Sequence, residues 1–573
     1  MGRRKKVKYF GNHLLGDYLN ERQAQILIKL QEVSEGQGGI EELRNMIDLL
    51  TDEQIDQIIA TGDPDVVPME ERAEGTLSDL QTVGVSYMYV AKRMILGDSV
   101  GLGKTVQISS LVKYMNLKAL QNQRRFNVLY LTEKNLVKQS RRELIKFSGL
   151  FFEELHGDKT SISKFNKKYD LDVVNICGSH SLLKHPDFHK WCNDFESYYN
   201  EFPFSMIVVD ESGKLLSNDS PKVATYHSAK LLADKAEYVI LMNAGSFENS
   251  LDKFRSQLAF VDSTFLFTKT EFSNRYQIMD WSMGRPSFNG KYKNAEDFRE
   301  KVALRYLKRT RKGQGARMID CSAELIEVEK SKIQKEFLRK SSMPQMVLDC
   351  PPYFDSSVEF TCENVPKAGA LVNLLNGELK NVGQVIVYTT LKEPHKHLKI
   401  LLEKYGIQSE VMNGSTPLAD RNRIIDDFKR GDIRVLITNV QRGLNFGSCN
   451  YAVFYNYDGN PNNMVQFEGR ITRDFDIINK HVYVIVTKGG EKKRLLNDIA
   501  RRAEASHEFA GSDFSMVLDL LKEESNKLKE TNDTFSKIYN KSKEKKIGTV
   551  NEPKPKPKIT KSQAMSRFRG GTN

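Results

Sequence analysis

Two sets of short apolar runs, separated by stretches with helical spacing, constrain the fold of this chain more than any other feature. One set lies between residues 94 and 242, and the other between residues 385 and 486. Such runs alternating with helices are typical of parallel sheets that carry helices on both faces. We therefore predict an α/β fold with two doubly wound parallel-sheet lobes and a cleft between them. The expected strands are residues 94–96, 128–131, 173–177, 206–209 and 238–242 in the first lobe, and 385–388, 410–412, 435–438, 452–455 and 482–486 in the second.

The segments outside these two sets predict additions to the lobes. Apolar residues recur at helical spacing between residues 19 and 60, which favours a small helical layer packed on the first lobe over an independent binding module. Residues 541–573 alternate lysine with proline and cannot form a packed core, so we expect them to be disordered. The expected regions are 1–76 (basic start and small helical region), 77–320 (first lobe), 321–366 (helical or irregular inter-lobe region), 367–490 (second lobe), 491–540 (C-terminal helices) and 541–573 (basic tail).

The excess positive charge lies at the two ends of the chain. The net charge is +12 over 573 residues, of which residues 1–8 contribute +5 and residues 541–573 contribute +8. The body of the chain is therefore close to neutral, and any nucleic-acid groove there must be argued from local residues. The basic tail either keeps the protein in solution or attracts polyanions in a salt-dependent way, and the sequence favours neither.

Composition excludes several classes of protein. Hydrophobic residues make up 39% of the chain, enough for real cores, so a wholly disordered protein is excluded. The six cysteines form no CxxC pair, which indicates reduced structural thiols and a cytoplasmic protein. No run approaches the roughly 18 apolar residues that a membrane span requires, so we expect no membrane partner.

The strongest local signal is residues 94–107, MILGDSVGLGKTVQ, an apolar strand that leads through a glycine-containing turn into a helix. The backbone N–H groups of such a turn, with the positive end of the helix, form a cradle for phosphates. Lys104 would reach the β- and γ-phosphates, and Thr105 would offer its hydroxyl to Mg²⁺. The general pattern has glycine where this chain has Asp98. The residues expected to bind nucleotide are Asp98, Ser99, Val100, Gly101, Leu102, Gly103, Lys104 and Thr105.

A second signal is residues 206–213, MIVVDESG, a buried strand that ends in two adjacent carboxylates. In enzymes with a phosphate loop, an aspartate at this position holds Mg²⁺, which points to Asp210. Glu211 could orient and deprotonate an attacking water. The alternative is that the two acids only cap the next helix, but the phosphate loop upstream favours the catalytic interpretation.

The second lobe contributes a third element, residues 458–473, DGNPNNMVQFEGRITR. Gln466, Arg470 and Arg473 have i, i+4 and i+7 spacing, which places them on one face of a helix. Two guanidiniums on one face are more often solvated than functional. Here they would meet a γ-phosphate held by the other lobe and neutralise the charge that develops during its transfer, as arginine fingers do.

Taken in chain order, these segments resemble the superfamily-two helicases, and within them the SWI/SNF-like branch of DNA translocases, most closely the compact viral or bacterial type. The resemblance runs from about residue 77 to about residue 486 and implies RecA-like lobes that use ATP and Mg²⁺. LSDLQTVGVSYM, residues 77–88, is similar to the Gln motif of this branch, which implies that Gln81 reads adenine. Other similar segments are 97–107 (motif I), 129–144 (motif Ia), 175–182 (contact with the tracked strand), 206–213 (motif II), 243–254 (motif III), 272–276 and 307–312 (inter-lobe stretches), 437–446 (motif V) and 465–473 (motif VI).

Three departures from the family pattern bear on how hydrolysis is linked to movement. Gly213 replaces the usual final histidine of motif II, motif III reads Asn-Ala-Gly-Ser, and motif V is one residue short. The residues expected to act on ATP all match the family. The resemblance therefore supports ATP hydrolysis more strongly than it supports its coupling to translocation.

The resemblance implies an ATP-dependent translocase on double-stranded DNA that remodels DNA or displaces bound proteins. A strand-separating or branch-migrating helicase, acting on branched DNA, is the first alternative; RNA is not excluded, and a non-cycling nucleic-acid scaffold is a weaker alternative. Lys134 and Lys138 in motif Ia and Thr438 in motif V are the expected phosphate contacts, although both lysines could equally lie on a solvated helix face. We expect a cytoplasmic location, in the host if the protein is viral.

Overall fold

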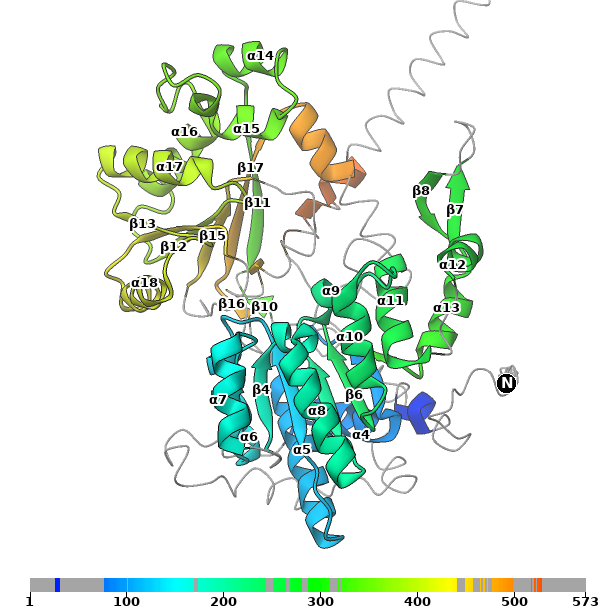
Figure 1. The fold of residues 1–573 in the computed structure, drawn as a ribbon. Coiled ribbons are helices and arrows are strands. Elements are labelled where there is room, and N and C mark those ends of the chain that lie inside the picture. Colours follow the sequence, from blue (N-terminus) through cyan, green and yellow to red (C-terminus); the bar gives the residue numbers. More distant parts are fainter. Residues whose placement is uncertain are drawn as a thin grey trace, which may run out of the picture. The chain divides into compact units, whose positions relative to one another are not determined.

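The structure is a computed structural model. Its described part contains two large parallel β-sheets that are covered by helices (Figure 1). It describes residues 26–30, 77–99, 101–169, 174–243, 251–263, 268–280, 287–309, 318–319, 321–440, 449–456 and 477–497, with isolated residues between 464 and 471 and between 517 and 527. The two sheets confirm the predicted fold class.

The first lobe is built on a seven-stranded parallel sheet with the order β3-β4-β2-β5-β6-β1-β9. Its strands are β1 (Arg93–Leu96), β2 (Val128–Thr132), β3 (Glu153–Leu155), β4 (Ile176–Ser179), β5 (Met206–Val209), β6 (Tyr238–Met242) and β9 (Tyr306–Leu307). The central strands are buried at every residue, as is typical of a parallel sheet covered on both faces.

Helices cover both faces of this sheet. On one face lie α4 (Asp79–Ala91), α5 (Lys104–Gln121) and α6 (Val137–Ser148), whose apolar residues share a core with Val128 and Val208. On the other lie α7 (Lys159–Tyr169), α8 (Pro186–Tyr199), α10 (Ala224–Ala233) and α11 (Leu251–Val261), around Ile207 and Leu241. The remaining elements are η2 (His180–Lys184), α9 (Ser212–Leu215), α12 (Lys269–Tyr276), α13 (Ala295–Val302) and an antiparallel hairpin of β7 (Gln277–Asp280) and β8 (Ser287–Tyr292).

The second lobe is built on a six-stranded parallel sheet with the order β11-β17-β15-β12-β14-β13. Its strands are β11 (Ser322–Val328), β12 (Val385–Tyr388), β13 (Ser409–Met412), β14 (Val435–Thr438), β15 (Tyr451–Phe454) and β17 (His481–Thr487). Helices α16 (Pro366–Asn376) and α17 (Glu393–Lys404) cover one face, and α18 (Leu418–Arg430) covers the other. Shorter elements are α14 (Lys332–Leu338), α15 (Pro344–Asp349), η5 (Pro351–Tyr353) and the paired two-residue strands β10 (Met318–Ile319) and β16 (Ile477–Ile478).

The structure differs from the sequence-based prediction at the start of the second lobe. Residues 321–366 were expected to be helical or irregular, but β11 forms an edge strand of the second sheet and pairs with β17 over its whole length. Its sequence, SAELIEV, alternates apolar with polar side chains except at the adjacent Leu325 and Ile326, which is close to the pattern of a half-buried strand. The short edge strands β3 and β9 were also missed, because runs of two or three residues give no periodicity.

Several predictions fall on residues outside the described ranges. Of the expected helical layer at residues 19–60, only residues 26–30 are described, and these are helical. The basic tail at 541–573 and most of the C-terminal helical region at 491–540 also lie outside. No described helix is long and apolar enough to cross a membrane.

Candidate active site

The phosphate-loop residues follow β1 at the carboxyl edge of the first sheet, where ligands of doubly wound folds bind. Gly101 and Gly103 have φ values of 88° and 73°, in the left-handed region that favours glycine. A Cβ atom at Gly103 would collide with the side-chain amide of Gln81, which shows that Gln81 lies directly against the loop. The structure therefore brings together two residues that were predicted separately. Val100 lies outside the described residues.

Lys104 opens helix α5 and folds back onto the loop. Its Nζ donates to the carbonyl oxygen of Asp98 at 2.6 Å and to that of Ser99 at 3.3 Å. The position of the ammonium therefore depends on the conformation of the loop backbone. Thr105, the next residue of the helix, is half-buried at the same end of α5.

The carboxylate of Asp98 braces the loop and does not point outward. It is fully buried and accepts hydrogen bonds from Arg309, with Nε to Oδ1 at 2.9 Å and Nη2 to Oδ2 at 2.5 Å. Gln107 Nε2 donates to Oδ2 at 3.2 Å. Protein donors thus hold both carboxylate oxygens of Asp98, and its expected part in nucleotide binding stays a prediction. Asp98 stands where glycine is usual because Arg309 accommodates it.

Asp210 and Glu211 follow β5 at the same edge of the sheet. Asp210 Oδ1 accepts the backbone N–H of Glu211 at 2.9 Å, and Oδ2 lies 3.4 Å from the hydroxyl of Tyr130. Burial and the neighbouring Glu211 raise the pKa of Asp210, whereas the ammonium of Lys104 opposes this rise. The phosphate-loop lysine and the motif II acids therefore lie close enough to interact electrostatically.

Glu211 itself has an unusual backbone conformation. Its φ of 51° and ψ of 41° are in the left-handed region, which costs a residue with a Cβ about 1 kcal/mol or more. The strain turns the chain abruptly from β5 into the short helix α9. Strained backbone of this kind concentrates at functional sites.

The segment that follows Glu211 is attached to helix α11. Ser212 is fully buried and its Oγ donates to Gln257 Oε1 at 3.0 Å, while Asn243 Nδ2 donates to the same oxygen at 3.4 Å. Asn243 is the first residue of the altered motif III, and residues 244–250 lie outside the described ranges. Gly213 is buried, where the family's usual histidine would place a ring.

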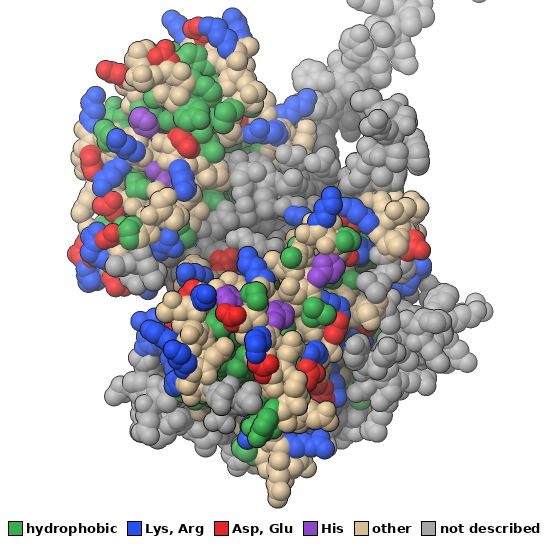
Figure 2. Space-filling model, in the orientation of Figure 1, with side chains coloured by type: hydrophobic (Ala, Val, Ile, Leu, Met, Phe, Trp, Pro, Cys, Tyr) green, Lys and Arg blue, Asp and Glu red, His purple; other side chains and the backbone are tan. Residues whose placement is uncertain are grey.

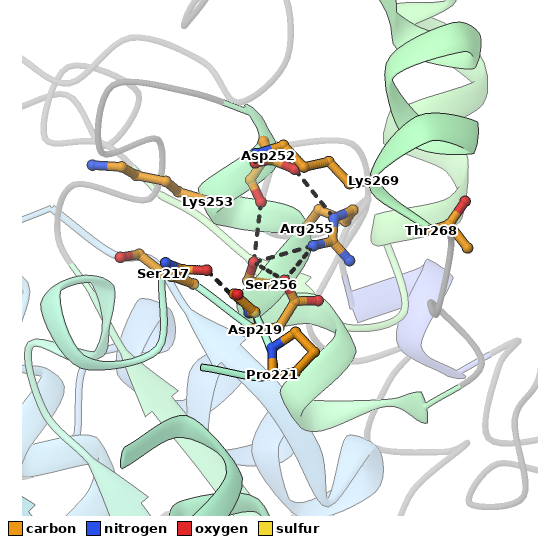
Figure 3. A pocket seen from close by; sticks show the side chains of 11 residues that line it. Ser217, Asp219, Pro221, Asp252, Lys253, Arg255, Ser256, Thr268 and Lys269 are labelled. Carbon is orange, nitrogen blue, oxygen red and sulfur yellow. Dashed lines mark hydrogen bonds and ion pairs between the residues drawn. The ribbon is translucent and has the colours of Figure 1, made fainter. Parts of the chain in front are cut away.

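A polar pocket of about 870 Å³ lies beside this segment, between the 217–221 loop, α11 and the start of α12 (Figure 3). Arg255 crosses its wall, with Nη2 2.6 Å from Asp219 Oδ1 and Nε 3.3 Å from Asp252 Oδ1. Ser256 Oγ also donates to Asp219, at 3.2 Å. The pocket wall is therefore a second tie between the chain after motif II and helix α11. No sequence pattern predicts this pocket, because its residues form no local motif.

The predicted nucleic-acid contacts have different outcomes. Lys134 is exposed in the turn between β2 and α6, and Lys138 is exposed in the first turn of α6, at the carboxyl edge of the first sheet. Figure 2 shows further Lys and Arg side chains along the edge of this lobe that α7 covers. Thr438 is fully buried at the end of β14, and its Oγ1 accepts the N–H of Val440 at 3.0 Å. Its hydroxyl therefore caps the strand end, and the expected phosphate contact of Thr438 stays a prediction.

The predicted arginine fingers belong to residues 458–473 of the second lobe. Gln466, Arg470 and Arg473 lie outside the described residues. Within that segment, the described residues Met464 and Phe467 are buried in the core of the second lobe. The meeting of these arginines with the phosphate loop stays a prediction.

Two protein families match the chain. The family described as SNF2-related domain matches residues 80–379, and the family described as Helicase conserved C-terminal domain matches residues 366–474. The first covers more than half of the chain. The two matches together span the phosphate loop, motif II, the first sheet and every strand of the second sheet except β17.

Several curated proteins are similar over most of the chain. The Caenorhabditis elegans SWI/SNF-related matrix-associated actin-dependent regulator of chromatin subfamily A containing DEAD/H box 1 homolog is 22% identical over 500 residues, covering 72% of this chain and 49% of the relative. The mouse DNA repair and recombination protein RAD54B is 21% identical over 470 residues, covering 70% and 52%. The uncharacterized ATP-dependent helicase YqhH of Bacillus subtilis is 21% identical over 449 residues, covering 70% and 74%. The chain thus spans about half the length of the first two relatives.

Among solved structures, the Sulfolobus solfataricus SWI2/SNF2 ATPase core in complex with dsDNA is 18% identical to this chain. The alignment covers 79% of this chain and 97% of that chain, with a TM-score of 0.36.

Proposed function

Because this chain belongs to the SNF2-related family, which its residues 80–379 match, we propose that it hydrolyses ATP to move along double-stranded DNA. One observation carries the proposal: Lys104, at the start of α5, and Asp210, directly after β5, lie at the same carboxyl edge of one parallel sheet. A phosphate-binding lysine next to paired acids is the arrangement that ATP hydrolysis requires.

The roles of the site residues follow from their places in the first lobe. Gln81 lies against the loop at Gly103 and would read the adenine, while the loop N–H groups and Lys104 would hold the phosphates. Because the loop leads directly into α5, the phosphates would also lie at the positive end of that helix.

Asp210 and Thr105 would hold Mg²⁺. The neighbouring carboxylate of Glu211 helps to raise the pKa of Asp210, and a divalent cation would offset the repulsion between these two acids. The carboxylate of Asp210 and the hydroxyl of Thr105 are oxygen ligands, which Mg²⁺ prefers. When bound, Mg²⁺ would supply charge neutralisation at the phosphates.

Glu211 is the proposed general base. A carboxylate can orient a water and accept its proton, provided that it lies within hydrogen-bond reach of the attacking oxygen. The backbone of Glu211 is in the left-handed region and ends the extended course of β5, in which Asp210 still shares a backbone hydrogen bond with Leu131. Two neighbouring acids could thereby serve different tasks.

We assign the second lobe to completion of the site and to tracking on DNA. Arg470 and Arg473, with Gln466, would neutralise charge on the γ-phosphate when the lobes close. Each closing and opening would shift one lobe along the strand, since both lobes would contact the DNA backbone. Lys134 and Lys138 are the proposed backbone contacts in the first lobe.

Two assays test this function in order. The first measures phosphate release with duplex DNA, single-stranded DNA or RNA as the stimulant; duplex DNA should stimulate most, and stimulation by RNA alone would overturn the DNA assignment. The second measures displacement of a third strand from a DNA triplex. Triplex displacement without separation of a simple duplex supports a translocase, whereas strand separation would assign the chain to the unwinding helicases.

A further inference from the structure

Arg309, which the sequence placed only within an inter-lobe stretch, touches three parts of the nucleotide site. We infer that it is a positioning residue, which holds the phosphate loop in place and ties it to the point where the chain leaves the first lobe. The inference rests on the proposed function, because it concerns the same nucleotide site. Arg309 does not itself reach substrate, so its effect would pass through Asp98.

Arg309 is only 3% exposed, and its guanidinium makes several hydrogen bonds. Besides its two hydrogen bonds to Asp98, Nη2 donates to Gln107 Oε1 at 2.8 Å and Nη1 donates to the carbonyl oxygen of Leu80. Leu80 precedes Gln81 in helix α4, and Gln107 lies in the first turn of α5. One side chain thus joins the adenine-reading helix, the phosphate loop and the helix that Lys104 opens.

We call the side-chain contacts of Arg309 with Asp98, Gln107 and Leu80 the clamp, and backbone hydrogen bonds accompany them. Gly97 N donates to Leu307 O at 2.8 Å and Ser99 N donates to Arg309 O at 3.0 Å, so the first residues of the loop continue the pairing of β1 with β9. The carbonyl groups of Asp98 and Ser99 are those on which Lys104 rests. Release of the guanidinium would therefore change the support of the catalytic ammonium.

Gly84 shows how closely α4 approaches the clamp. A Cβ atom at this position would collide with the ends of the Gln107 and Arg309 side chains. Both atoms are at the far ends of flexible side chains, so an added methyl group can displace them without breaking the helix. Gly84→Ala would therefore loosen the clamp while every charge stays in place.

The other end of the clamp is the connection to the second lobe. Arg309 follows β9, the last strand of the first sheet, and the chain then runs through residues 310–317 to β10 and β11, of which β11 belongs to the second sheet. A movement of the phosphate loop on nucleotide binding would therefore displace Arg309, directly before the connecting residues 310–317. That is the coupling between two sites that a motor needs.

Arg305 provides a matched control. It lies four residues earlier, is 1% exposed, and forms an equally buried ion pair with Asp262, Nε to Oδ2 at 2.7 Å. Asp262 follows helix α11 and has no part in the phosphate loop. Lysine keeps the charge of either arginine but cannot make the planar two-pronged contact, so Arg305→Lys and Arg309→Lys should cost similar stability.

The experiment measures the affinity of the full chain for a fluorescent ATP analogue, its affinity for duplex DNA without nucleotide, and its melting temperature. Arg309→Lys should weaken analogue binding about tenfold or more, the scale of one lost charge-assisted hydrogen bond, with DNA affinity unchanged. Arg305→Lys should bind the analogue as the parent does. Gly84→Ala should weaken analogue binding like Arg309→Lys, and it replaces that variant if Arg309→Lys does not fold.

Equal analogue affinities for Arg309→Lys and Arg305→Lys would overturn the inference and leave Arg309 a structural residue. So would a Gly84→Ala protein with parental affinity. Failure of the proposed function is seen separately, since the parent protein would then bind no analogue or show no DNA-stimulated hydrolysis.

Discussion

The ammonium of Lys367 lies 2.8 Å from Oδ1 of Asp349, and neither side chain is exposed to solvent. Glu491 Oε1 lies at the same distance from the ammonium, so one buried cation serves two carboxylates. Asn456 Nδ2 donates to the other oxygen of Asp349 at 2.9 Å. This network joins α15, α16 and the segments that follow β15 and β17.

Removal of Lys367 should destabilise the second lobe strongly. Lys367→Met leaves two buried carboxylates without their cation, which costs about 3–5 kcal/mol. Hydrogen exchange of the β15 and β17 amides measures the loss, and the β5 and β6 amides of the first lobe should keep their protection. The matched control is Lys399→Met, which removes a partly exposed pair with Glu410 at 2.9 Å and should cost at most about 1 kcal/mol. If both variants lost the same free energy of unfolding, the buried network would contribute no more stability than the partly exposed pair.

Lys104→Ala should abolish ATP turnover and leave duplex DNA binding almost unchanged. Loss of a preorganised cation that stabilises transferred charge lowers kcat by about 100-fold or more. Phosphate release and DNA fluorescence anisotropy measure the two effects. Lys118→Ala is the control, because Lys118 lies in the last turn of the same helix and contacts Tyr89. Hydrolysis by Lys104→Ala at the parental rate would show that the nucleotide site is misplaced.

Glu211→Gln should separate nucleotide binding from hydrolysis. The substitution keeps the shape of the side chain but removes its capacity to accept a proton, so kcat should fall about 10²- to 10⁴-fold with little change in ATP affinity. Single-turnover hydrolysis and analogue binding measure the two quantities. Glu237→Gln, which removes an exposed acid near Lys92, should change neither. A variant that loses affinity while kcat persists would assign Glu211 to binding.

The sequence predicted those parts of the site whose residues lie next to one another in the chain. The strand, loop and helix at 94–107 and the acids after the strand at 206–209 are local patterns, and the alternation of strands and helices places both at one sheet edge. Glycines with positive φ, such as Gly103, mark the same turn. These features depend only on neighbouring residues in the chain, so they can be recognised from the sequence alone.

The remaining features depend on contacts between distant segments. Arg309 and Asp98 are 211 positions apart, and the buried pair has no periodicity that a window of residues could detect. The motif spacing that singled out Thr438 does not reveal that its hydroxyl is buried and bonded to the backbone. For β11, the alternating pattern was present, but its place in the second sheet is decided by pairing with β17, more than 150 residues later.

His395 should make the second lobe less stable as the pH falls below neutral. It is 2% exposed in helix α17, and burial lowers its pKa from 6.5 to about 4. Between these two pH values the unfolded chain binds a proton at His395 that the folded chain does not bind. The free energy of unfolding therefore increases as the pH rises through this window and decreases as the pH falls through it. From pH 7 to pH 5 the loss from this one group is about 2 kcal/mol.

The comparison that isolates this group is His395→Gln against the parent, with urea unfolding at pH 7 and at pH 5. Glutamine stays neutral at both values, so the variant should lose about 2 kcal/mol less than the parent between them, even though it is less stable overall. Carboxylates elsewhere titrate equally in both proteins and cancel in the difference. His227→Gln, at an exposed histidine of α10, should keep the parental pH dependence. If His395→Gln shows the parental dependence too, the buried imidazole is already protonated in the folded chain or is reached by water.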